Sequence, residues 1–200
     1  DQIININFSK FIDDCLSRSI DGSIMTFKDI SKNPIKDLDS NSSITEIIAT
    51  LNEYGIEYNI NKSKATVCLW GTGKALREFL YVDDMASASI FVLELDKSLY
   101  DIYTKPTLSH INIGTGIDVT ISELANNIKN IVGFRGELSF DTIKPDGSAR
   151  KLIDTSKLSK MGWTYDVSLE VGLKKTYKWI EHQINSGANI DKFCRGSIEK

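Results

Sequence analysis

An α/β fold is predicted by two hydrophobic periods that alternate along the 200-residue chain. Strand-like alternation at residues 110–113 is followed by helical spacing at 122–132 and by strand-like alternation at 137–141. A strand-helix-strand order of this kind is typical of α/β architecture. A composition of 41% hydrophobic and 26% charged residues is that of an ordinary folded domain with a buried core.

The first part of the chain predicts two helices separated by a loop. Four apolar residues at helical spacing predict a short helix over residues 8–18, and residues 20–42 are rich in Ser, Asp, Asn and Lys, which predicts a loop. Ser43-Ile-Thr-Glu46 has the form of a capping box and is followed by apolar residues at helical spacing. We therefore expect a second helix that ends before Gly55.

A glycine-containing turn joins two predicted strands near the middle of the chain. Apolar and polar residues alternate over residues 65–70 and again over 77–82, with Gly71-Thr-Gly-Lys74 between them. Trp70 then ends one strand and Arg77 lies early on the next. We expect the indole and the guanidinium to line one cleft across this turn.

The remaining elements follow from the same patterns. A helix over residues 85–95 is expected to be capped by Asp83 or Asp84, and residues 96–108 are predicted to be a polar connection. In chain order, the other predicted elements are a strand at 110–113, a helix at 122–132 opened by Thr120-Ile-Ser-Glu123, a strand at 137–141, a short helix at 154–161 and a long helix from Ser168.

Charge and cysteine content exclude several classes of function. A net charge of −3 gives no electrostatic footprint for nucleic acid or for an anionic membrane. No apolar run approaches the roughly 18–20 residues that span a bilayer. The three cysteines (Cys15, Cys68 and Cys194) are widely spaced and form no CxxC, which indicates neither a disulfide framework nor a metal site. A reducing cytoplasm is therefore predicted.

Arg77 and Trp70 are the first candidates for ligand contacts. A guanidinium grips phosphate oxygens bidentately, as lysine cannot, and an aromatic ring beside a glycine turn adds a flat contact surface. This combination suits a nucleotide diphosphate. The spacing alone favours a plainer interpretation, in which Arg77 is a solvated strand residue paired with Asp83 or Asp84 and Trp70 is a partly buried aromatic at a strand end.

Two further loops carry weaker signals. Pro145-Asp-Gly-Ser-Ala-Arg-Lys151 is by pattern a surface β-turn, because Pro-Asp-Gly is a typical turn sequence. Gly114-Thr-Gly116 lies between a predicted strand and a predicted helix, where dinucleotide-binding loops also lie. The third glycine of such a loop is missing and the helix opens several residues later, so no cofactor site is predicted there.

Catalytic residues are not predicted anywhere in the chain. Tyr58 and Lys62 have the Tyr-x-x-x-Lys spacing of a reductase, but that chemistry needs a helix and this copy follows the helix-ending Gly55. His110 and His182 have no nearby Ser, Cys or carboxylate set that would complete a nucleophilic triad.

Three blocks of sequence together resemble the GDP-L-fucose synthases, which are extended short-chain dehydrogenases/reductases that act on GDP-sugars. The blocks are Trp70-Gly-Thr-Gly with Arg77-Glu-Phe-Leu-Tyr-Val-Asp-Asp-Met-Ala86, then His110-Ile-Asn-Ile-Gly-Thr-Gly116, then Pro145-Asp-Gly-Ser-Ala-Arg-Lys151. They occur in the family's order, and the resemblance covers roughly residues 20–185.

The resemblance implies the C-terminal, substrate-binding part of an extended Rossmann-type enzyme whose cofactor-binding sheet is largely missing. In the family, NADPH reduces the C4 carbonyl of an epimerised GDP-4-keto-6-deoxy-hexose, and the glycine-rich loop and Tyr/Lys pair that this needs would precede Asp1. Arg77 would neutralise the substrate's diphosphate and Trp70 would line its cleft. Asp146 and Lys151 would contact the nucleotide.

The resemblance also implies a domain organisation and partners. Residues 1–63 would form a helical and loop segment with a family-variant insertion, residues 64–185 the substrate-binding α/β region, and residues 186–200 a frayed tail. The partners would be a GDP-sugar and a second copy of the chain, joined through helices upstream of Asp1. Without the cofactor sheet, we expect the isolated chain to be poorly soluble, molten or dependent on a partner. A cooperative thermal melt with sharp near-ultraviolet dichroism would contradict that.

Two alternatives remain open. One is a non-catalytic module that binds a GDP-sugar, and the other is a reductase of another GDP-deoxysugar or of a GDP-heptose.

Overall fold

The computed structural model describes residues 43–53, 55–59 and 64–186, which form helices and two three-stranded sheets. The predicted α/β class is confirmed, and the predictions for residues 8–18 and 20–42 lie outside the described residues. The helices are α2 (Ile44–Glu53), α3 (Val82–Glu94), α4 (Lys97–Tyr103), α5 (Ile121–Val132), α6 (Ser156–Met161) and α7 (Leu169–Asn185). The strands are β1 (Ile56–Asn59), β2 (Lys64–Trp70), β3 (Leu76–Glu78), β4 (Asp118–Thr120), β5 (Glu137–Asp141) and β6 (Arg150–Lys151).

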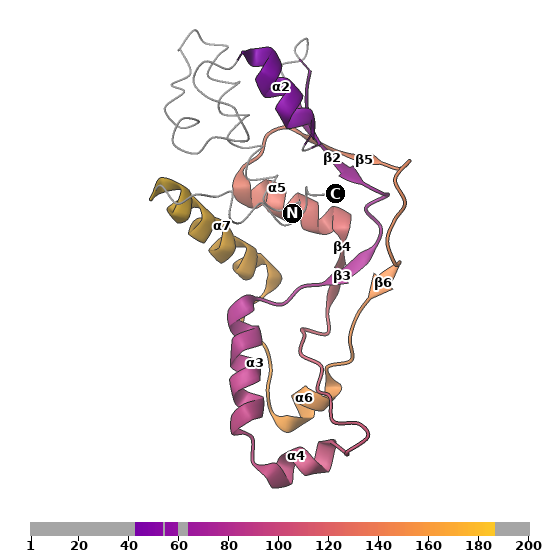
Figure 1. The fold of residues 1–200 in the computed structure, drawn as a ribbon, viewed down its shortest axis with the longest axis vertical. Coiled ribbons are helices and arrows are strands. Elements are labelled where there is room, and N and C mark those ends of the chain that lie inside the picture. The colour runs from indigo at the N-terminus through magenta and orange to yellow at the C-terminus, as the bar shows by residue number, and fades with distance from the viewer. Residues whose placement is uncertain (1–42, 54, 60–63, 187–200) are drawn as a thin grey trace.

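The two sheets repeat one arrangement. In the first, β2 is central, antiparallel to β1 and parallel to β5; in the second, β3 is central, antiparallel to β4 and parallel to β6. Figure 1 shows an elongated molecule with α2 and the first sheet at one end and α3, α4 and α6 at the other. The second sheet, α5 and α7 lie between these ends, so the turn between β2 and β3 connects the two sheets.

Each end of the molecule has its own hydrophobic core. The larger core lies between the first sheet and helices α2 and α5, and its most buried members include Leu51, Ile56 and Val67. Helix α7 packs against this core. The smaller core is built on Ala88, Leu158 and Trp163.

The capping box predicted at Ser43 is confirmed, and the structure has a second one at Thr120. The amide of Ser43 donates to the Glu46 carboxylate at 2.7 Å, while the Glu46 amide donates to the Ser43 hydroxyl at 3.3 Å. Thr120 and Glu123 make the same reciprocal pair at the start of α5. These local hydrogen bonds satisfy amide groups that a helix start would otherwise leave without a partner.

The predicted strand at 77–82 is wrong in length and in placement. Strand β3 ends at Glu78, and it belongs to a different sheet from β2, with which it is not paired. The segment that follows passes between the two cores, so Phe79 packs against the larger one and Leu80 against the smaller one. The alternation of residue types after Glu78 therefore reflects a chain buried against a core on each side, and it does not reflect pairing with another strand.

The predicted strand at 110–113 is wrong for a similar reason. Ile111 and Ile113 both pack against the smaller core, and the Asn112 side chain between them donates to the Asp154 carbonyl at 3.0 Å. The segment alternates as an extended chain does, but no described strand pairs with it. The strand next to β3 comes later, at β4.

Two predictions around α3 and α4 also need correction. Helix α3 begins at Val82 with no side-chain cap. Asp84 is instead buried, and its carboxylate accepts a hydrogen bond from the Asp166 amide. The expected polar connection at 96–108 contains α4, whose start is capped by Asp96. With only seven residues, α4 is too short for a helical period to be recognised in the sequence.

The outer side of α3 exposes several large apolar side chains. Val82, Ile90 and Leu93 are all exposed, and so is Ile102 on α4. Surface of this kind favours association with another apolar surface. The expectation that the isolated chain is poorly soluble or molten stays a prediction. Within the described ranges, no helix combines the length and the apolar content that crossing a bilayer requires.

Candidate functional site

The turn after β2 is crossed at very short range by the loop between β5 and β6. Gly71 and Gly73 both have positive φ, at 82° and 73°, which side chains rarely adopt. A Cβ atom added at Gly71 would lie 2.2 Å from Oδ1 of Asp146, and one at Gly73 would lie 2.4 Å from the ring of Phe140. The backbone therefore requires glycine at both positions, with the crossing loop leaving no room for a side chain at Gly71 and Phe140 of β5 leaving none at Gly73.

Gly71→Ala is expected to destabilise the protein and to move the crossing loop. Gly162 is a matched control, because it also has a positive φ of 109° but an added Cβ there meets no described atom within 4 Å. Left-handed backbone costs an alanine roughly 1–2 kcal/mol at either position. We expect chemical denaturation to show the larger decrease in the free energy of unfolding for Gly71→Ala, because only this variant adds the clash with Asp146. Equal losses for the two variants would contradict the close crossing.

Asp146 is held by a residue that the sequence did not single out. The Thr72 backbone amide donates to Oδ1 of Asp146 at 2.7 Å, and the Thr72 hydroxyl donates to Oδ2 at 2.6 Å. The side-chain bond from Thr72, followed by its backbone bond and the nearby charge of Lys74, holds the pKa of Asp146 below its ordinary value of 3.8. Asp146 is therefore a carboxylate at neutral pH.

The Arg77 side chain is half-buried and turned toward the same loop. Its Nη1 atom donates to the carbonyl oxygens of Leu76 and Ser148, both at 2.7 Å. A Cβ atom added at Gly147 would lie 3.1 Å from Nη2, so the guanidinium lies directly against this glycine. The described residues show no ion pair between Arg77 and Asp83 or Asp84, which contradicts the interpretation favoured by spacing alone.

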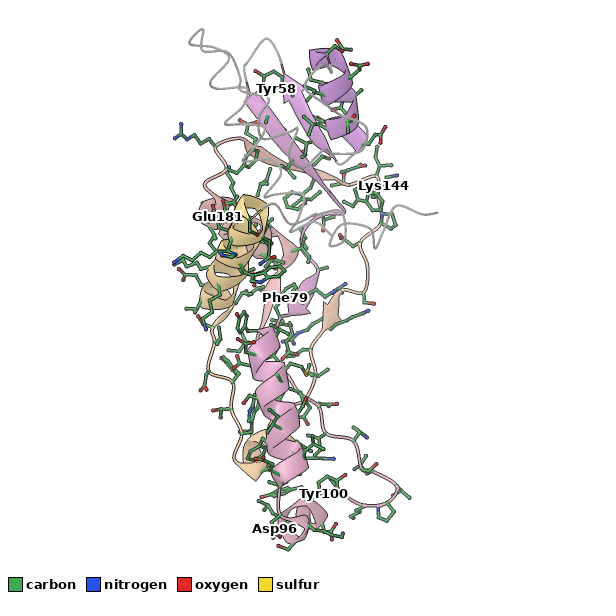
Figure 2. The ribbon with its side chains drawn as sticks, turned by 60° about the vertical axis from the view of Figure 1, so that its left-hand side comes forward. Tyr58, Phe79, Asp96, Tyr100, Lys144 and Glu181 are labelled. Carbon is green, nitrogen blue, oxygen red and sulfur yellow. The ribbon has the colours of Figure 1, made fainter. Side chains whose placement is uncertain are left out.

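Trp70 ends β2 opposite Asp141 of β5 and leaves 68% of its surface exposed. The ammonium group of Lys144 lies 5.4 Å from the centre of the indole ring, within the range of a cation–π contact. Figure 2 shows Lys144 on the opposite side of the molecule from Glu181 of α7. The exposed indole therefore lies at the surface formed by the loop after β5.

Positive charge collects around this loop. Lys151 is exposed on β6 and lies beside Arg77 in the parallel pairing of β3 and β6. Arg150, by contrast, forms a bidentate pair with Asp118 at 2.5 and 3.2 Å, which lowers the pKa of that carboxyl. Arg150 is therefore neutralised by Asp118, whereas Arg77 and Lys151 still contribute positive charge beside the loop. This local positive charge contrasts with the net charge of −3 of the whole chain.

The structure brings Arg77, Asp146 and Lys151 together at the loop of residues 142–149. Trp70 joins them through Gly71, which touches Asp146, and not through a pairing of β2 with β3. A cleft shared by the indole and the guanidinium stays a prediction. Thr72 was missed because its partner is 74 residues away, and no local pattern marks such a contact.

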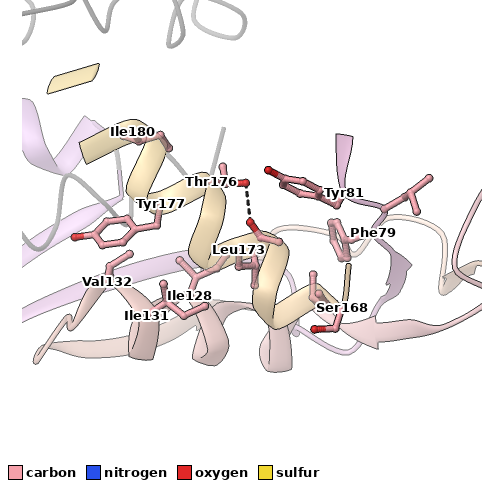
Figure 3. Close-up of a pocket in the computed structure, with 13 residues that line it drawn as sticks. Phe79, Tyr81, Ile128, Ile131, Val132, Ser168, Leu173, Thr176, Tyr177 and Ile180 are labelled. Atoms are coloured by element: carbon pink, nitrogen blue, oxygen red, sulfur yellow. Dashed lines mark hydrogen bonds between the residues drawn. The ribbon is translucent and has the colours of Figure 1, made fainter. Parts of the chain in front are cut away.

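An apolar cavity of roughly 160 Å³ lies elsewhere, between α5, α7 and residues 79–81. Figure 3 shows that aliphatic and aromatic side chains such as Ile128, Leu173 and Tyr177 surround it, and its lining residues carry no charge. A diphosphate needs cations or aligned amide groups. This cavity therefore does not fit the ligand that Arg77 suggests, and none of the four predicted site residues lines it.

The other candidates stay unremarkable. Tyr58 lies on β1 and packs against the larger core, and Lys62 lies outside the described residues. His110 is exposed in a segment without regular structure, and His182 is exposed near the end of α7. In the described part of the chain, no group of three or more His, Cys, Asp or Glu side chains could hold a metal ion.

Neither the Gly114–Gly116 loop nor the start of α5 fits the pyrophosphate of a dinucleotide cofactor. The loop at Gly114–Gly116 is occupied by Glu78, whose carboxylate accepts from the Gly116 amide at 2.6 Å. The start of α5, where a pyrophosphate would bind, is capped by its own Glu123. Because both amide sites already hold a carboxylate, a second anion would be repelled.

The chain spans about a third of the length of the curated relatives that it matches. A family model described as "NAD dependent epimerase/dehydratase family" matches residues 32–114. The GDP-L-fucose synthase of Escherichia coli K12 is 52% identical over 118 residues, which are 58% of this chain and 37% of that protein. The resemblance stated from the three sequence blocks is confirmed.

Two solved structures from Campylobacter jejuni extend the similarity to nearly the whole chain. A GDP-6-OMe-4-keto-L-xylo-heptose reductase has a TM-score of 0.70 and 32% identity, and the match covers 91% of this chain and 47% of that one. A GDP-mannoheptose C4 reductase with NADP bound has a TM-score of 0.64 and 32% identity over 90% and 45% of the two chains. The arrangement of helices and sheets is thus that of GDP-sugar reductases.

Proposed function

Since the chain is similar to GDP-L-fucose synthases over more than half of its length, we propose that it binds a GDP-sugar as the substrate-binding part of an NADP-dependent epimerase/reductase. The complete enzyme would convert GDP-4-keto-6-deoxy-mannose to GDP-L-fucose. The observation that carries the proposal is the half-buried Arg77, held by the Ser148 carbonyl against the loop that contains Asp146.

In this proposal each of the four site residues has one role. Arg77 neutralises the diphosphate through Nε and Nη2, because Nη1 already serves two carbonyl oxygens. The exposed indole of Trp70 gives the substrate a flat surface at the mouth of the site. Asp146 accepts hydrogen bonds from the nucleotide, and Lys151 adds positive charge beside Arg77.

The chemistry of this chain is therefore binding and orientation. Its residues hold the nucleotide end of the substrate so that the sugar carbonyl has a fixed position, which lowers the entropic cost of reaction. NADPH would supply the hydride in the family's reaction, and the residues that bind it would lie outside the described part of the chain. We propose that residues 1–200 alone do not oxidise NADPH, that the enzyme is a homodimer, and that it functions in the cytoplasm.

A reductase of a GDP-heptose is the nearest alternative. The heptose reductases match more of this chain than the E. coli enzyme does, but their identity is 32% against 52%. We prefer the fucose-type substrate because the identity to that enzyme is higher. A module that binds a GDP-sugar without catalysis would use the same residues.

Calorimetric titration with GDP tests the proposal directly. We expect the chain to bind GDP, and to bind guanosine at least about tenfold more weakly because guanosine lacks the group that Arg77 meets. Guanosine binding as tight as GDP would contradict a diphosphate site, and so would the absence of GDP binding by a chain whose near-ultraviolet dichroism shows that it is folded. NADPH oxidation by the isolated chain with the keto-sugar would contradict the proposal that this chain binds the substrate but does not by itself catalyse the reduction.

A further inference from the structure

We infer that Thr72 is a positioning residue that fixes the carboxylate of Asp146 in the orientation in which it receives the nucleotide. This inference rests on the proposed function, in which Asp146 binds that nucleotide. Thr72 itself need not touch the ligand.

The Thr72–Asp146 contact uses both oxygens of the carboxylate. The amide of Thr72 serves Oδ1 at 2.7 Å and its hydroxyl serves Oδ2 at 2.6 Å, so the plane of the carboxylate cannot rotate without breaking one bond. A carboxylate held by a single donor would keep that freedom. Two donors from one residue therefore determine which way the remaining lone pairs point.

Thr72 is in turn held by its own surroundings. The Gly71 amide donates to the Asp141 carbonyl at 2.9 Å, which ties the start of the turn to the end of β5. The Lys74 amide donates to the Thr72 hydroxyl at 3.3 Å. Because this amide fills an acceptor position of the hydroxyl oxygen, the hydroxyl proton is left to point at Asp146. The orientation is thus set before any ligand arrives.

The Asp146 carboxylate remains available to a ligand. Its residue is exposed, and a carboxylate has more lone pairs than Thr72 occupies. The low pKa of Asp146 keeps it an acceptor at neutral pH. Two residues later in the same loop, the Ser148 carbonyl accepts from Arg77. The bonds from Thr72 and from Arg77 thus hold two ends of one short loop segment, so Asp146 and the Arg77 guanidinium keep a fixed position relative to each other.

Thr72→Val tests the positioning role, with GDP as the probe in calorimetric titration of the full chain. Valine removes the hydroxyl but keeps the shape and the backbone amide, so we expect GDP affinity to fall roughly three- to tenfold. Thr72→Ser keeps the hydroxyl and should bind GDP within about twofold of the parent chain. Thermal melts of both variants check that the fold is retained.

A double-mutant cycle distinguishes positioning from a general structural effect. If Thr72 acts through Asp146, Thr72→Val should cost little further affinity in a chain that already carries Asp146→Ala. An undiminished loss in that background would overturn the inference, and so would unchanged affinity for Thr72→Val alone. Arg77→Ala reports on the proposed function separately. If it weakens GDP binding while Thr72→Val does not, only the positioning role fails; if GDP does not bind at all, both fail.

Discussion

Arg77→Ala is expected to lower the affinity of the chain for GDP by about 10- to 100-fold, which corresponds to one or two charge-assisted hydrogen bonds to phosphate. The guanidinium is well placed for this loss to be seen. Its Nη1 is already engaged by two backbone carbonyls, so the side chain is ordered before the ligand binds. Little conformational entropy remains to be lost on binding.

The choice of ligands and variants separates phosphate binding from damage to the loop. Arg77→Ala also removes the bond to Ser148, so it could loosen the loop without any direct contact to phosphate. A direct contact predicts that affinity for GDP falls while affinity for guanosine does not. Arg77→Lys should lie between the parent and alanine, since it keeps the charge and loses the planar fork.

Arg135→Ala provides a remote control for charge. Arg135 is exposed just before β5, whose first residue pairs with Thr66, at the opposite end of that strand pair from Trp70. Removing its charge should leave GDP affinity nearly unchanged. If Arg135→Ala lowered GDP affinity as much as Arg77→Ala, the effect of Arg77→Ala would be due to the change in net charge and not to a direct contact with phosphate.

Asp84→Ala is expected to destabilise the protein by about 2–3 kcal/mol. Asp84 is only 5% exposed, and its carboxylate accepts from the amides of Asp166 and Val167 at 3.2 and 3.0 Å. Alanine would leave both amides without this acceptor in a partly buried place. Urea denaturation measures the change in the free energy of unfolding.

Asp83 is the matched control for this prediction. It lies in the same first turn of α3, where an acidic side chain interacts favourably with the helix dipole, but it is exposed. Asp83→Ala should therefore cost no more than roughly 1 kcal/mol. Asp84→Asn keeps one acceptor oxygen and should fall between the two. Equal effects for Asp83→Ala and Asp84→Ala would show that the buried bonds contribute nothing.

Much of the fold could be predicted because its signals are local. The helix starts at Ser43 and Thr120 were recognisable because a capping box needs only four consecutive residues. The errors came from segments 77–82 and 110–113, where the same alternation was produced by packing into cores. Alternation measures which side chains are buried, and it does not record which strand, if any, lies alongside.

The candidate site divides in the same way. Residue chemistry indicated Arg77 and Trp70, and the resemblance added Asp146 and Lys151. The contact of Asp146 with Thr72, and that of Arg77 with Ser148, could not be predicted, because each joins parts of the chain more than 70 residues apart. The positive φ of Gly71 was expected of a turn, but the loop that crosses it was not.

By itself, the sequence determined the α/β class, the capped helices and the glycine turn, and it suggested a ligand that would suit a planar cation. All of these depend on intrinsic side-chain chemistry or on neighbours within a few residues. Only the tertiary structure decided that β2 and β3 belong to separate sheets, and that the loop after β5 unites the site. The physical reason is that long-range pairing depends on how distant segments pack together, which no single stretch of residues encodes.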